Sequence, residues 1–193
     1  MQMTGEYRIP ASRQTVWEAL NDPEILRQCI PGCEELTTTE DGGFAAKVTA
    51  KVGPVRAKFA GKVTLSDLDP PNGYKISGQG QGGAAGFAKG GAQVKLEDDG
   101  DATVLSYTVD ATVGGKLAQV GSRLIDATAK KMADQFFSCF AETVGGPAEA
   151  VEEAEARPAE IAAEAGRKAG LPAAVWVGGL IGIVIILLLL FAL

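Results

Sequence analysis

The sequence predicts an α+β domain in which a curved, seven-stranded antiparallel sheet wraps round one long C-terminal helix. Apolar and polar residues alternate along short segments separated by Gly-, Pro- and Asp-rich turns, as in half-buried strands. The period becomes helical over residues 116–143, and the sheet is expected to cover the apolar face of that helix. The domain is therefore assigned to residues 1–143, followed by an Ala/Glu-rich tether (144–171) and a transmembrane helix (172–193).

The first elements carry clear end signals. Residues 2–9 alternate as a strand, and two short helices are expected after it, at 13–20 and 24–29. Ser12 and Asp22 are the expected N-caps of these helices, because short polar side chains accept hydrogen bonds from the free N–H groups of a first turn.

Six more strands follow, at a spacing typical of an antiparallel meander. They are predicted at 34–39, 44–52, 55–68, 74–81, 87–97 and 102–113. The long helix carries an apolar stripe formed by Leu117, Val120, Leu124, Thr128, Met132, Phe136 and Phe140.

Composition excludes several classes of function. The chain has 18 Lys and Arg against 24 Asp and Glu, so its charge does not favour nucleic acid as a partner. It has no histidine, which excludes Ser-His-Asp and Cys-His nucleophiles and His-ligated metal. The three cysteines (Cys29, Cys33 and Cys139) are expected to be reduced thiols, because their number is odd and the predicted compartment is reducing. No metal site is predicted.

The end of the sequence predicts the location. Residues 173–193 carry no charge, and a helix of that length spans about 30 Å, the thickness of a bilayer's hydrocarbon core. The first residues lack the apolar run of a secretory signal, and Arg167 and Lys168 favour a cytoplasmic position for the domain. We expect a single-pass C-terminal anchor that includes Ala173, Trp176, Leu180, Ile185 and Leu193.

Four segments carry a family resemblance: 22–36 (DPEILRQCIPGCEEL), 52–65 (VGPVRAKFAGKVTL), the glycine-rich 78–96 and 115–137. With the order of elements, they resemble the carbon monoxide dehydrogenase CoxG family, within the START-like (SRPBCC) helix-grip superfamily. The resemblance implies a non-enzymatic accessory protein that recruits a cytoplasmic molybdenum CO dehydrogenase to the bacterial inner membrane, where electrons enter the respiratory chain. The alternative is a START-like enzyme or carrier for another hydrophobic small molecule, with Tyr74, Tyr107 or Asp110 as the acid–base group.

The inward positions of the predicted sheet are unusually small, and two interpretations follow. Aromatic side chains fill the space beneath the helix, or an apolar pocket there holds a lipid or an isoprenoid quinone without a covalent bond. The residues expected to line that space are Phe44, Phe59, Tyr74, Phe87, Tyr107, Leu117, Val120 and Leu124.

Five cations alternate with the buried positions of two neighbouring strands and are expected on the outward face. They are Lys47, Lys51, Arg56, Lys58 and Lys62. One interpretation is a solvated face that resists edge pairing. The other is a docking patch for anionic lipid or for an acidic partner such as the dehydrogenase.

Overall fold

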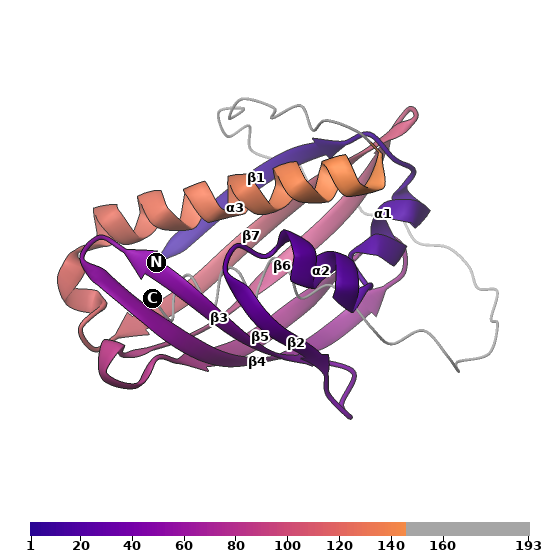
Figure 1. Ribbon diagram of the computed structural model, residues 1–193. Helices are drawn as coiled ribbons and strands as arrows, with labels where there is room; N and C mark the ends of the chain where they lie inside the picture. Colours follow the sequence, from indigo (N-terminus) through magenta and orange to yellow (C-terminus); the bar gives the residue numbers. More distant parts are fainter. Residues whose placement is uncertain (146–193) are drawn as a thin grey trace.

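Seven antiparallel strands form one sheet that curves round helix α3 (Figure 1). The structure is a computed structural model and describes residues 1–145. The predicted transmembrane helix (172–193) and all but the first two residues of the predicted tether (144–171) lie outside the described residues. Within residues 1–145, no helix is long and apolar enough to span a membrane.

The strand prediction is confirmed. The strands are β1 (Gln2–Ile9), β2 (Cys33–Thr38), β3 (Phe44–Val52), β4 (Val55–Asp69), β5 (Gly73–Gln81), β6 (Phe87–Asp99) and β7 (Ala102–Gly114). Their order across the sheet is β1-β7-β6-β5-β4-β3-β2, and every neighbouring pair is antiparallel. The sheet is therefore a meander except that β1 pairs with β7, so β1 and β2 form its two edges.

Both short helices have the predicted caps. The Ser12 side chain accepts a hydrogen bond from the Thr15 N–H at the start of α1 (Arg13–Ala19). The Asp22 carboxylate accepts one from the Glu24 N–H, at 2.8 Å, at the start of α2 (Pro23–Cys29). The two helices pack at one end of the sheet (Figure 1).

The long helix starts later than predicted. Instead of one helix over 116–143, a short 3-10 turn η2 (Ala118–Val120) precedes α3 (Ser122–Val144). Gly121 lies between them with φ of +97°, a conformation that L side chains rarely adopt, and it ends the first turn. Since Leu117 and Val120 precede this break, the predicted stripe is not continuous across it.

An aromatic cluster holds the C-terminal half of α3 against the sheet. The ring of Phe137 stacks on Tyr7 of β1 at 3.9 Å between centroids and on Tyr107 of β7 at 5.8 Å. Phe136 and Phe140 are fully buried beside it. Burying one such ring contributes about 1.5–3 kcal/mol, so this cluster is a main source of the attachment of α3.

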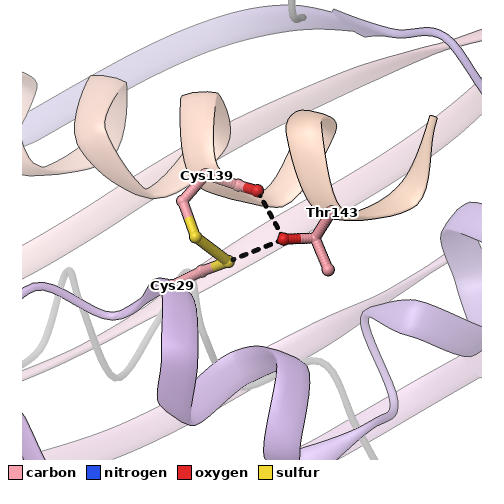
Figure 2. The surroundings of a disulfide bond; sticks show 3 residues. All are labelled: Cys29, Cys139 and Thr143. Carbon is pink, nitrogen blue, oxygen red and sulfur yellow. Dashed lines mark hydrogen bonds between the residues drawn. A yellow bond between two sulfur atoms is a disulfide. The ribbon is translucent and has the colours of Figure 1, made fainter. Parts of the chain in front are cut away.

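A disulfide makes a second attachment, contrary to the prediction of three thiols. Cys29 at the end of α2 and Cys139 on α3 have Cα atoms 5.3 Å apart and are bonded (Figure 2). The Thr143 hydroxyl lies 3.7 Å from the Cys29 sulfur and donates to the Cys139 carbonyl at 2.8 Å. Cys33 is free and half-buried, and burial raises the pKa of its thiol. The packing of α2 on α3 brings together two cysteines 110 residues apart, which spacing alone does not reveal.

The disulfide predicts a redox-dependent stability. Reduction releases a cross-link that spans 110 residues, so the free energy of unfolding is expected to fall by about 2–4 kcal/mol. Urea unfolding of the domain with and without dithiothreitol measures this change. Cys33→Ser should retain the response and Cys139→Ser should lose it; a parent protein indifferent to dithiothreitol would contradict the assignment.

Candidate functional site

The middle of the concave sheet face consists of glycine and alanine. Gly61, Gly80 and Ala88 pair in one row across β4, β5 and β6. The next row continues through β7 and contains Gly78, Gly90 and Ala111. We call these six residues the small-residue floor; because they have at most a methyl side chain, they project little into the space beneath α3.

The part of α3 that lies over the middle of the sheet is also poor in large side chains. Leu124 lies beside the turn between β3 and β4, and Phe136 lies at the aromatic cluster. Between them, the buried residues of α3 are Ile125, Ala129, Met132 and Ala133. The helix approaches the sheet chiefly at β1 and β3, on either side of the floor. Two layers of mostly small residues therefore face each other here.

Aromatic rings occupy the margins of this region, where glycine makes room for them. A Cβ atom at Gly82 would overlap the ring of Phe59, and one at Gly5 would overlap the ring of Tyr107. The interpretation in which aromatic rings fill the interior therefore describes its margins, while the floor itself carries no ring.

Tyr74 places an unpaired polar atom in the interior. It is 2% exposed, its ring meets that of Trp17 edge-on at 5.7 Å, and its hydroxyl has no hydrogen-bond partner within residues 1–145. Burial raises its pKa well above the ordinary value. By contrast, the Tyr7 hydroxyl donates to Asp134 at 2.6 Å. Leaving a buried hydroxyl unpaired costs about 1–3 kcal/mol, so a polar atom supplied by a bound molecule would stabilise Tyr74.

Tyr107 lies near Tyr74 in the register but in a different environment. The two residues share a row through Val94, their common neighbour on β6. Burial raises the pKa of Tyr107 to about 12, partly offset by a hydrogen bond to Tyr7. Both tyrosines are therefore neutral donors at physiological pH.

The predicted pocket residues do not all reach the interior. Five are buried there: Phe44, Phe59, Tyr74, Tyr107 and Leu117. Phe87 is 45% exposed on the outer face, where its ring covers Gly114, because strand alternation places Ala88 and Ala92 inward and so turns Phe87 outward. Leu124 is 40% exposed at one end of the domain, and Val120 beside it is half-buried.

The five predicted patch cations share the outer face, but three of them are paired. Lys47, Lys58 and Lys62 form ion pairs with Glu35 (2.6 Å), Glu34 (2.9 Å) and Asp41 (3.0 Å). Lys51 and Arg56, opposite each other beside the β3–β4 turn, have no ion pair within residues 1–145. The acidic residues of β2 and of the β2–β3 turn neutralise one end of the patch, an arrangement that depends on the strand order.

The catalytic alternative retains two of its three groups inside the fold. Asp110 lies exposed on the outer face, where its carboxylate accepts a hydrogen bond from the Gln2 amide at 3.2 Å. Tyr74 and Tyr107 are inside. In the described part of the chain, no group of three or more Cys, Asp or Glu is arranged to hold a metal ion.

The curved sheet closed by one long helix defines a START-like, helix-grip protein. A START superfamily protein from Mycobacterium smegmatis shares this fold, with a TM-score of 0.55 and 15% identity over 74% of this chain and 96% of that one. The Zhui aromatase/cyclase from Streptomyces does so with a TM-score of 0.51 and 14% identity, over 75% and 93% of the two chains.

The sequence identifies the family within this class. The family model described as carbon monoxide dehydrogenase CoxG matches residues 5–145, so the chain belongs to that family. A conserved protein from Geobacillus kaustophilus, of known crystal structure, is 30% identical with a TM-score of 0.71, over 75% of this chain and 95% of that one. A comparison with curated protein sequences gives no significant match. The resemblance carried by the four sequence segments is confirmed.

The unpaired Tyr74 hydroxyl predicts an unusual mutational effect. Tyr74→Phe removes a buried polar atom without a partner, so the ligand-free domain should gain about 1 kcal/mol in free energy of unfolding. Tyr7→Phe, which removes a hydroxyl bonded to Asp134, should lose about the same amount. Urea denaturation compares the two variants, and a destabilised Tyr74→Phe domain would show that the hydroxyl is already paired.

Proposed function

We propose that this chain is a membrane-anchored accessory protein that recruits a cytoplasmic molybdenum CO dehydrogenase to the bacterial inner membrane and binds an isoprenoid quinone or a related lipid. Family membership supports the partnership with the dehydrogenase. The observation that carries the ligand proposal is the buried, unpaired Tyr74 hydroxyl on the concave face that also holds the small-residue floor.

The residues of the interior match the two parts of such a ligand. A quinone ring has carbonyl oxygens that accept hydrogen bonds, and Tyr74 is a buried donor without an acceptor. Its isoprenoid chain is apolar, and the floor offers apolar backbone-lined surface with little side-chain volume. The residues present therefore fit this class of ligand, with Tyr74 fixing its polar end.

The proposal assigns the redox chemistry to the dehydrogenase. The chain has no histidine, and the two tyrosines of its interior remain neutral. Groups of this kind bind and orient a molecule rather than exchange electrons with it. The role left for the chain is to hold the ligand beside its partner.

The membrane part of the proposal rests on the sequence beyond the described residues. An uncharged apolar segment at 173–193 would form a single-pass anchor, and residues 144–171 would tether the domain on the cytoplasmic side. Such a tether holds the domain close to the lipids from which it takes its ligand, so anchoring raises their local concentration at the domain.

An alternative function is a carrier or enzyme for another hydrophobic small molecule. The shared fold with the Zhui aromatase/cyclase favours keeping it, since that name describes an enzyme. Catalysis would then depend on Tyr74 or Tyr107, and the substrate would need a group that accepts a proton from a phenol.

Fluorescence tests the ligand proposal directly. A protein ending at Gly145 contains Trp17 as its one tryptophan, and this ring touches Tyr74. A short-chain isoprenoid quinone should quench Trp17, and Tyr74→Phe should weaken binding about five- to tenfold through the loss of one hydrogen bond. Tyr7→Phe is the matched control and should bind as the parent does. Absence of quenching in the parent would count against a quinone and favour the alternative.

Cell fractionation tests recruitment separately. The dehydrogenase should sediment with membranes when the full chain is present and remain soluble when the chain ends at Gly145. Appending an unrelated transmembrane helix after Gly145 should restore sedimentation, because only anchoring has been lost. A dehydrogenase that stays soluble beside the full chain would contradict recruitment.

A further inference from the structure

At the end of the domain opposite α1 and α2, exposed apolar residues from two distant segments meet. The turn between β3 and β4 lies beside the N-terminal end of α3 (Figure 1). A Cβ atom at Gly53 would lie 2.6 Å from Leu124 Cδ2 and 3.6 Å from Val120 Cγ1, which measures how closely the segments approach. Leu124 is 40% exposed and Pro54 is also exposed. We call Pro54, Val120 and Leu124 the apolar lip.

Basic residues surround the apolar lip. Lys51 and Arg56 pair across the β3–β4 hairpin on one side of it. Lys116 and Arg123 precede and follow η2 on the other side, and both are exposed. None of the four forms an ion pair within residues 1–145, whereas the other three cations of the predicted patch do. Asp126 is the acidic residue of the first turns of α3, so positive charge predominates.

A second exposed leucine of the described residues has the opposite surroundings. Leu68, near the far end of β4, is 42% exposed but lies between Asp67 and Asp69. Nearly equal exposure with opposite charge means that the basic surroundings of Leu124 are specific to that end of the domain.

The start of α3 also departs from the pattern that stabilises a helix. It has no side-chain cap and no acidic residue in its first turn, and Arg123 lies where the helix dipole disfavours a cation. Sequences depart from such local rules chiefly where a function requires it. A cation at this position is useful if an anionic surface faces it.

We propose that the apolar lip and the four cations around it form a surface through which the folded domain itself contacts an anionic lipid bilayer. Apolar side chains enter the interface between headgroups and acyl chains, while Lys and Arg attract anionic headgroups. This contact requires neither the C-terminal anchor nor a ligand, so it goes beyond the proposed function. It would turn the end of α3 that borders the small-residue floor toward the membrane.

Vesicle binding by the isolated domain tests the proposal. The Geobacillus relative consists almost entirely of the matching region, which supports the use of residues 1–145 alone. These residues should sediment with phosphatidylcholine–phosphatidylglycerol vesicles at low ionic strength and much less with phosphatidylcholine alone. Lys51→Glu/Arg56→Glu should lower the partition coefficient at least tenfold, because each basic residue lost costs about a factor of five. Leu124→Asp should lower it several-fold.

Matched controls separate this surface from general charge. Lys75→Glu/Lys95→Glu makes the same charge change at the opposite end of the sheet, and Leu68→Asp removes the second exposed leucine; both should bind nearly as the parent does. Equal loss in the controls, or no vesicle binding by the parent, would overturn the proposal. So would binding of the lip residues to the dehydrogenase in place of vesicles. Circular dichroism verifies folding, and the Lys51/Arg56 pair keeps the test decisive if Leu124→Asp does not fold.

Discussion

The attachment of α3 to the sheet is the interaction on which the rest of the domain depends. Its C-terminal half is held by Phe136, Phe137 and Phe140 against β1 and β7, and by the Cys29–Cys139 disulfide to α2. Once that half is fixed, the other half can lie over glycine and alanine without large side chains of its own. A helix held at one end can close an interior that it does not fill.

Local signals in the sequence predict most of the fold. The caps at Ser12 and Asp22 and the alternation within each strand depend on neighbouring residues, so the elements are predictable with small errors at their ends. The failures have a common cause in long-range arrangement. The break at Gly121 and the partner of Cys29 depend on how α3 meets distant segments, which no local pattern encodes.

The candidate site shows the same division. Strand alternation places Phe44 and Phe59 inward correctly, whereas the inward prediction for Phe87 follows its hydrophobicity against the alternation of its own strand. The orphan hydroxyl of Tyr74 is beyond prediction, because a hydrogen-bond partner is known only once every neighbour is placed. Likewise, the ion pairs of the patch lysines depend on the acidic residues of β2 and of the turn that follows it.

The central claim is that the interior beneath α3 holds an apolar ligand with a polar end. Mass spectrometry of the organic extract of the purified domain, prepared from cells that contain isoprenoid quinones, tests it most directly. A quinone or related lipid in stoichiometric amount is the predicted result, with much less in Tyr74→Phe. A parent domain that carries no lipid and takes up none when mixed with membranes would contradict the claim, because its interior would then be closed by its own side chains.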